Sequence, residues 1–138
     1  MHPFLNIADR AARMAGKTIL DGLKRLDRIR MQEKQANRGV VTEIDLKAES
    51  IIIDTIREAY PRHGILAEES NPIDGEGYIW IIDPLDGTSN YIHDFPHFAV
   101  SIAIKNKEKD RIEHALIYDP LRQETFTATR GQGAYLDN

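Results

Sequence analysis

The stretch Phe98–Ile104, FAVSIAI, decides the fold class because its side chains change character at every second residue. Large apolar residues occupy alternate positions, and Ala99, Ser101 and Ala103 lie between them. A period of two is typical of a β-strand whose two faces have different surroundings. The stretch is therefore predicted to be a strand within a larger sheet.

Further strands are predicted on both sides of this one. Towards the carboxyl end, Ile112–Tyr118 and Thr125–Thr129 form a predicted hairpin around the turn-forming sequence DPLR. Ala134–Leu136 follows two glycines and is predicted to begin another strand. Towards the amino end, Ile65–Ala67 and Tyr78–Ile82 are short apolar runs of strand length.

The first sixty residues have a helical period instead. Apolar residues at three- and four-residue steps predict a helix over residues 3–26, followed by a polar loop to about Gly39. Thr42 and Asp45 resemble a capping box that starts a second helix, which Pro61 ends. The first predicted buried face comprises Phe4, Ile7, Ala11, Met14, Ala15, Ile19, Leu23 and Leu26. The second comprises Ile44, Ala48, Ile51, Ile52, Thr55, Ile56 and Ala59.

Two helices followed by strands predict an α+β fold, with the helices packed on one face of a mainly antiparallel sheet. Residues 1–138 are expected to form a single domain. No apolar run reaches the roughly 18 residues of a membrane span, so no membrane partner is expected. The chain has no cysteine, which excludes disulfides and thiolate metal sites and fits a cytoplasmic location. Its net charge of −4 gives no overall attraction to nucleic acids.

Acidic residues stand at the ends of several predicted elements. Glu68 follows a short strand, Asp83 and Asp86 follow the next strand, and Asp45 lies on the first turn of the second helix. If these carboxylates converge, they repel one another unless a cation neutralises them. Oxygen ligands alone favour a hard cation, and Mg²⁺ is the expected one. Each feature also has a simpler explanation, as a solvated loop, a common turn or a helix cap.

The sequence around Pro84 adds a stereochemical argument. Pro84 fixes one backbone angle, so that Asp83 and Asp86 can face one site and the Leu85 carbonyl can point inward. Gly87 allows a phosphate to approach the backbone closely. Residues 88–93 are predicted to form a short helix whose first amides face that phosphate.

Three motifs in order resemble the inositol monophosphatase family. The segment WIIDPLDGTSNYIH, Trp80–His93, resembles its first signature, Gly64–Ser70 its glutamate motif and Val41–Asp45 its Val-Thr-x-x-Asp motif. Met1–Gly16 and Phe95–Gly133 resemble the bacterial SuhB-type branch of this lithium-sensitive group. The resemblance covers nearly the whole chain and implies the amino-terminal half of the inositol monophosphatase and fructose-bisphosphatase-like fold.

This resemblance implies a phosphoric monoester hydrolase that uses Mg²⁺. Its expected metal ligands are Glu68, Asp83, the Leu85 carbonyl and Asp86. Its expected catalytic residues are Asp45, Thr88 and Glu68, and its expected substrate-binding residues are Asp86, Gly87 and Thr88. The implied reaction is in-line attack of metal-activated water on a small phosphate monoester such as myo-inositol 1-phosphate.

The chain departs from the family at its end. Family members are about twice as long, and a second signature of the Trp-Asp-x-Ala-Ala-Gly type supplies another aspartate. The only tryptophan here is Trp80, so the carboxy-terminal half is expected to be absent and hydrolysis by this chain to be weak. The sheet is then expected to expose apolar surface.

The resemblance also leaves other partners open. Relatives are often dimers, so a homodimer is one option. SuhB-type relatives are associated with transcription and ribosomal RNA synthesis, so the alternative function is a non-catalytic interaction protein with RNA polymerase or antitermination partners. The basic residues that favour it are Lys24, Arg25, Arg28, Arg30, Lys34 and Arg38.

Overall fold

The computed structural model describes residues 1–29, 31–33 and 40–137. Its helices are α1 (Pro3–Leu23), the 3-10 turn η1 (Leu26–Arg28), α2 (Glu43–Ala59) and α3 (Thr88–Ile92). Its strands are β1 (Met31–Glu33), β2 (Val40–Thr42), β3 (Gly64–Ala67), β4 (Tyr78–Asp86), β5 (Ala99–Asn106), β6 (Arg111–Asp119), β7 (Glu124–Thr129) and β8 (Ala134–Leu136).

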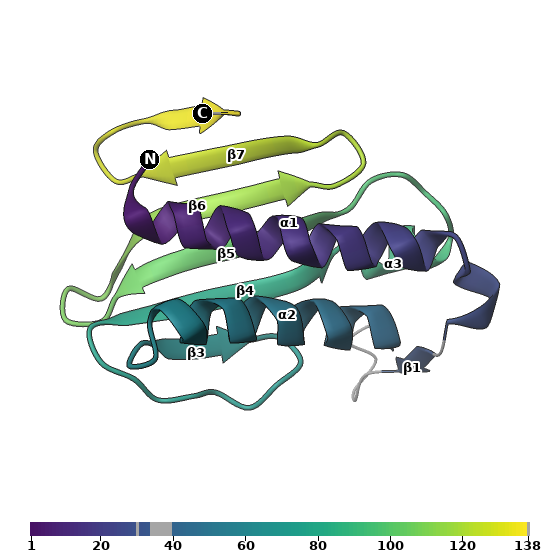
Figure 1. Ribbon diagram of the computed structural model, residues 1–138, viewed down its shortest axis with the longest axis horizontal. Helices are drawn as coiled ribbons and strands as arrows, with labels where there is room; N and C mark the ends of the chain where they lie inside the picture. Colours follow the sequence, from purple (N-terminus) through teal and green to yellow (C-terminus); the bar gives the residue numbers. More distant parts are fainter. Residues whose placement is uncertain (30, 34–39, 138) are drawn as a thin grey trace.

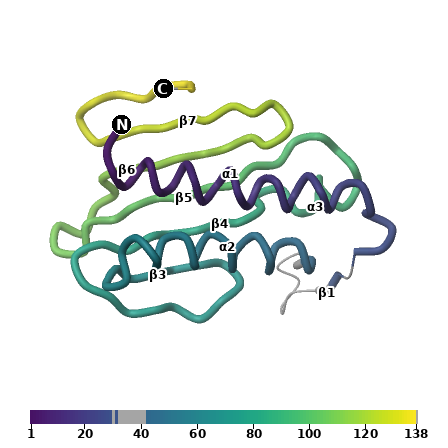
Figure 2. The backbone as a smooth tube through the Cα atoms, in the orientation of Figure 1, coloured from purple at the N-terminus to yellow at the C-terminus, as the bar shows by residue number. Residues whose placement is uncertain are grey.

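Strands β3 to β8 form one sheet in sequence order, and α1 and α2 lie side by side across one face of it (Figure 1). β3 pairs parallel with β4, and every later neighbour is antiparallel. The backbone trace shows the short α3 beyond the end of β4, below the carboxyl end of α1 (Figure 2). The predicted α+β class, with helices on one face of a mainly antiparallel sheet, is confirmed.

The buried face of α1 differs from the predicted one. Leu5, Ala8 and Ala12 are buried, whereas the side chain of Met14 is 50% exposed. Small residues along this face bring the helix close to its neighbours, because a Cβ on Gly22 would lie 2.2 Å from the Tyr91 hydroxyl. The helix also ends at Leu23, three residues earlier than predicted, and continues as η1.

The start of α2 agrees with the sequence prediction. The Thr42 hydroxyl accepts hydrogen bonds from the amides of Ile44 and Asp45, and the Asp45 carboxylate accepts one from the Thr42 amide at 2.9 Å. This reciprocal capping box satisfies amides that have no partner inside the helix. It also fixes the Asp45 side chain at the helix start.

Two other predictions about local structure were wrong. The strand that begins at Tyr78 does not end at Ile82 but continues through Pro84 to Asp86, with a register shift between Asp83 and Asp86. Pro84 is tolerated because the ladder is already irregular at this point. The region predicted as a polar loop contains β1, which pairs antiparallel with β2 directly after that region, while residues 34–39, including Gly39, lie outside the described residues.

The two faces of the sheet have different surroundings. Ile102 and Leu116 are paired across β5 and β6 and are each 1% exposed beneath the helices. The adjacent row points the other way, and there Ile117 pairs with Phe126 and Phe126 with Leu136, with exposures of 46, 44 and 46%. The predicted apolar surface is therefore present on the face that the helices do not cover. No described helix has the length and apolar character needed to cross a bilayer.

Candidate metal and phosphate site

Asp45 and Thr88 meet although 43 positions separate them in the sequence. The capping box holds one oxygen of Asp45, which also accepts a 2.5 Å hydrogen bond from the Thr42 hydroxyl. The other oxygen, Oδ1, accepts a hydrogen bond from the Thr88 hydroxyl at 2.9 Å. Asp45 is 2% exposed, so its charge is held by hydrogen bonds rather than by water.

The Thr88 hydroxyl also lies 3.0 Å from the Leu85 carbonyl oxygen. A hydroxyl has one hydrogen, so it donates to Asp45 or to Leu85 but not fully to both. If a cation engages the Leu85 carbonyl, the hydrogen is directed to Asp45. The lone pairs of Thr88 then remain available to another donor, such as a water molecule.

A second acidic group forms beside this pair, at the end of β4. Here the carboxyl group of Glu68 lies close enough to Asp83 to favour the protonated form of Asp83, both by hydrogen bonding and by charge. Burial, then the hydrogen bond and charge of Glu68, then the charge of Asp86, raise the pKa of Asp83 to about 8. The Leu85 amide, 3.3 Å from Asp83, opposes this rise in pKa by donating to the carboxylate.

The donor chemistry of this acidic group fits a hard divalent cation. The charges of Glu68 and Asp86 both oppose ionisation of Asp83, and a bound cation would relieve that repulsion. Within the described ranges, however, no three Asp, Glu, His or Cys side chains are grouped closely enough to hold an ion as they stand.

Gly87 connects the end of β4, which carries Asp83 and Asp86, to α3, and its backbone conformation is one that favours glycine. Its φ is +97°, in the left-handed region, and it forms the N-cap of α3. A Cβ at this position would lie 2.9 Å from the His97 carbonyl oxygen and 3.2 Å from the Phe98 Cβ. Gly87 therefore packs directly against residues 97 and 98, and a side chain here would disturb the junction between β4 and α3. The phosphate contact of the Gly87 and Thr88 amides stays a prediction.

Tyr91 anchors α3 against α1. Its hydroxyl donates to the Ile19 carbonyl oxygen at 2.8 Å, in the space that Gly22 leaves open. Burial, and then the negative charge of Asp45, raise the pKa of Tyr91. The residue was not among the predicted site residues, and it fixes the short helix that carries Thr88.

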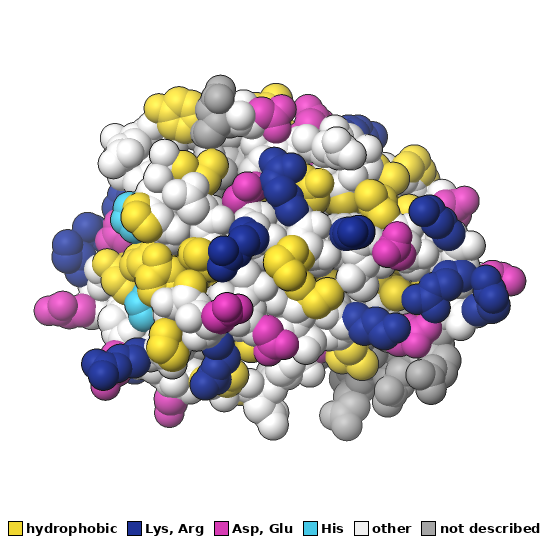
Figure 3. Space-filling model, in the orientation of Figure 1, with side chains coloured by type: hydrophobic (Ala, Val, Ile, Leu, Met, Phe, Trp, Pro, Cys, Tyr) yellow, Lys and Arg dark blue, Asp and Glu magenta, His cyan; other side chains and the backbone are white. Residues whose placement is uncertain are grey.

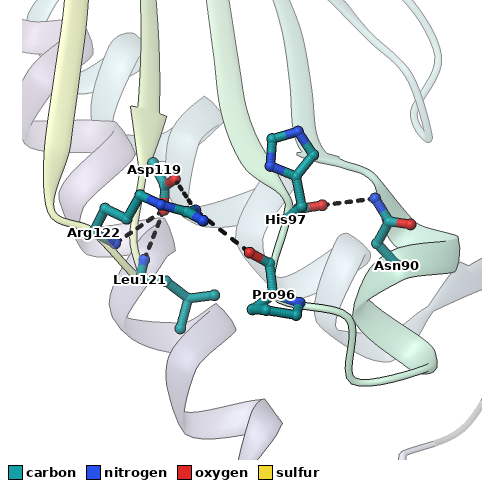
Figure 4. A network of polar contacts seen from close by, with 6 residues as sticks. All are labelled: Asn90, Pro96, His97, Asp119, Leu121 and Arg122. Carbon is teal, nitrogen blue, oxygen red and sulfur yellow. Dashed lines mark hydrogen bonds and ion pairs between the residues drawn. The ribbon is translucent and has the colours of Figure 1, made fainter.

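A pocket of about 530 Å³ lies directly beside Asp86 and Gly87. One wall is fixed by polar contacts between the chain after α3 and the β6–β7 turn (Figure 4). There Arg122 donates to Asp119 at 2.8 Å and to the Pro96 carbonyl at 3.4 Å, and Asn90 donates to the His97 carbonyl at 2.8 Å. The floor includes the apolar side chains of Phe98, Ile117 and Phe126. The site therefore opens onto a partly apolar hollow.

Glu49 is a buried acidic residue that the sequence prediction missed. It is 1% exposed, and its oxygens accept hydrogen bonds from the Glu69 amide at 2.8 Å and from the Ser70 hydroxyl. The sequence contained a signal, because Glu49 falls on the otherwise apolar stripe of α2, one turn after Asp45. A charged residue in such a stripe needs partners of its own.

Comparison with known proteins supports the predicted resemblance. The family model described as "Inositol monophosphatase family" matches residues 1–138. The chain belongs to this family. It is 55% identical over 141 residues to the Pseudomonas aeruginosa protein named Nus factor SuhB, an alignment that covers 99% of this chain and 51% of that protein.

Solved structures of the inositol monophosphatase family agree with the fold. The SuhB extragenic suppressor protein of Bartonella henselae superposes with a TM-score of 0.94 at 36% identity, covering 99% of this chain and 53% of that one. The inositol monophosphatase of Thermotoga maritima gives a TM-score of 0.87 at 31% identity, covering 99% and 52%. The chain thus spans about half the length of these relatives.

Proposed function

We propose that the chain carries the Mg²⁺- and phosphate-binding part of a phosphoric monoester hydrolase, with a small substrate such as myo-inositol 1-phosphate. The observation that carries the proposal is the hydrogen bond between Thr88 and Asp45, made by residues from two distant elements. This bond lies beside the mutually repelling carboxyls of Glu68, Asp83 and Asp86. Membership of the inositol monophosphatase family favours the same reaction class.

The residues of the chain have distinct roles in this proposal. Glu68, Asp83, Asp86 and the Leu85 carbonyl would hold Mg²⁺, which lowers the pKa of water and stabilises the leaving alkoxide. Thr88 orients the attacking water, and Asp45, with Glu68, accepts its proton. Asp86 and the amides of Gly87 and Thr88 bind the substrate, so catalysis relies on positioning and charge rather than on a covalent intermediate.

The test is Mg²⁺-dependent release of phosphate from inositol 1-phosphate by the purified chain. We expect slow turnover, because no Trp-Asp-x-Ala-Ala-Gly segment occurs in these 138 residues. Asp83→Asn should abolish it, whereas Asp54→Asn, the same change at an exposed position on α2, should leave it intact. Turnover that survives chelation of Mg²⁺ or the Asp83 change would overturn the proposal, and absence of turnover in every sample would restrict it to ion binding.

A second function is favoured by the name of a close relative, Nus factor SuhB. We propose, as the alternative, a non-catalytic role in transcription complexes through the basic segment at the end of α1. Lys24 and Arg28 are exposed and Arg25 is half-buried, and Lys and Arg side chains gather at this end of the molecule (Figure 3). Arg30, Lys34 and Arg38 lie outside the described residues.

This alternative predicts binding that weakens as salt increases. A fluorescent single-stranded RNA would be titrated with the chain at two salt concentrations, since each phosphate contact steepens the salt dependence. The double variant Lys24→Glu with Arg28→Glu should lose binding, and Lys107→Glu with Lys109→Glu, on the β5–β6 turn, is the control. Equal loss with both pairs, or no binding at low salt, would eliminate the alternative.

A further inference from the structure

We propose that Glu49 is a positioning residue that holds the loop bearing Glu68 in place for cation binding. The proposal rests on the function proposed above, because it assigns to Glu68 a role as ligand. It concerns a residue on α2 that touches neither the substrate nor the ion. Its evidence is the set of hydrogen bonds between this helix and the loop after β3.

The Glu68 loop is fixed from two sides. The Glu68 amide donates to the Ile82 carbonyl oxygen at 3.2 Å, which ties the loop to β4. The next amide, that of Glu69, donates to Oε2 of Glu49 at 2.8 Å, and the Ser70 hydroxyl donates to Oε1. The Glu68 side chain itself is exposed, so these backbone contacts limit where it can lie.

The chemistry of Glu49 suits this task. A carboxylate only accepts hydrogen bonds, and here each oxygen meets a donor from the loop. Placing a charge at a position that is 1% exposed is costly unless such bonds compensate it. An apolar residue would fill the space in the core equally well, so the carboxylate is explained by the loop that it holds.

The spacing along α2 gives Glu49 a partner in this role. Asp45 lies four residues earlier, so both carboxylates project from the same face of one helix. Asp45 holds Thr88, and Glu49 holds the segment that follows Glu68. A single rigid helix therefore sets the separation between the residue that orients water and a residue that would bind the ion.

The test measures Mg²⁺ affinity by isothermal titration calorimetry. Glu49→Gln keeps the shape but turns one acceptor into a donor, which then faces a donor from the loop. We expect the dissociation constant to rise by about 10-fold or more, as for other residues that orient metal ligands. Glu58→Gln makes the same change on an exposed part of α2, and Ile52→Val weakens the buried core on the same helix without removing a hydrogen bond to the loop. Neither control should change Mg²⁺ affinity.

A second readout does not depend on any ion. Amide hydrogen exchange at Glu69 should accelerate by about 10-fold or more in Glu49→Gln, because the amide loses its acceptor and the loop opens more easily, whereas exchange in the centre of β5 should not. If Glu49→Gln fails to fold, Ser70→Ala removes one of the two bonds from an exposed position and should give a smaller change in the same direction. Unchanged exchange at Glu69, or unchanged affinity in folded Glu49→Gln, would overturn the inference. Absence of Mg²⁺ binding by the unaltered chain would instead overturn the proposed function, and the exchange measurement would still decide whether Glu49 holds the loop.

Discussion

At the scale of the residue, Thr88 is the group whose role can be separated from ion binding. Its hydroxyl bonds to Asp45 and lies near the Leu85 carbonyl, while its side chain is not one of the proposed ligands. Thr88→Val removes the hydroxyl and preserves the shape. Loss of a group that orients water should reduce turnover by about 100-fold or more, with Mg²⁺ affinity unchanged. Thr88→Ser should retain most of the turnover, and equal losses in both variants would contradict the assignment.

We expect Asp83 to lower the stability of the folded chain in the absence of ions, although the proposed ion binding requires it. In the chain without ions, its carboxyl is partly buried beside Glu68 and Asp86, which raises its pKa to about 8. A raised pKa means that burying this carboxyl lowers the stability of the folded state at neutral pH. Asn has a similar shape and cannot ionise. Asp83→Asn should therefore raise the melting temperature by about 3 °C, which corresponds to roughly 1 kcal/mol for a chain of this size. A lower melting temperature in calorimetry without Mg²⁺ would show that Asp83 is not under electrostatic strain.

The site residues differ in how far sequence alone could identify them. Asp45, Glu68, Asp83 and Thr88 are predicted from motifs, and the structure joins Asp45 to Thr88 and places Glu68 beside Asp83. Their roles in catalysis and ion binding stay predictions. Glu49 was missed because its partner is a backbone amide twenty residues away. Contacts of this kind depend on tertiary packing, which a local pattern does not contain.

At the scale of the element, periodicity predicted the existence of helices and strands better than their faces or ends. The buried face of α1 was misplaced because Ala and Gly, which carry little hydrophobic signal, make its closest contacts. β4 was predicted too short because Pro84 ordinarily ends a strand. The parallel pairing of β3 with β4 was not predicted, since pairing direction depends on the connection and not on the strand sequence.

The junction between β4 and α3 gives a prediction at this scale. Gly87 and Gly131 both have positive φ, but only at Gly87 would a Cβ meet other atoms. Gly131→Ala should cost about 1 kcal/mol of unfolding free energy from backbone strain alone. Gly87→Ala adds a clash with the His97 carbonyl and should cost about 2–3 kcal/mol. Chemical denaturation measures both, and equal costs would mean that the junction relaxes.

The rings of Tyr60, His63 and Trp80 pack together at the end of α2. We expect this group to make the stability of the folded chain decrease in acid. Trp80 donates to Nδ1 of His63 at 3.0 Å, and burial lowers the pKa of His63. A lowered pKa means that the folded state favours neutral imidazole, so this contribution is present at neutral pH. It is lost as the pH falls below about 6.5, where the unfolded chain gains protons first.

Melting temperatures measured between pH 7.5 and 5 test this contribution. His63→Phe keeps a ring against Tyr60 and Trp80 but cannot titrate, so its melting temperature should fall less steeply with acid. His97→Gln, at an exposed position, serves as the control and should behave like the unaltered chain. Parallel curves for all three proteins would exclude His63 as a source of acid sensitivity.

At the scale of the whole molecule, the uncovered sheet face is the main feature. Ile117, Phe126 and Leu136 form an exposed apolar row across β6, β7 and β8, opposite the face that carries the helices. Exposed rows of this kind promote association. We expect concentration-dependent self-association in sedimentation velocity, reduced by Phe126→Gln and unaffected by Leu46→Gln on the exposed side of α2. A monomer at all concentrations would show that this face is inert.

The central claim is that the carboxyls at the end of β4 form a cation site, and calorimetric titration with Mg²⁺ tests it most directly. The titration would compare the unaltered chain with Asp83→Asn and Asp54→Asn. The account predicts saturable Mg²⁺ binding by the unaltered chain and by Asp54→Asn, and none by Asp83→Asn. No binding by the unaltered chain, or equal binding by all three proteins, would contradict it.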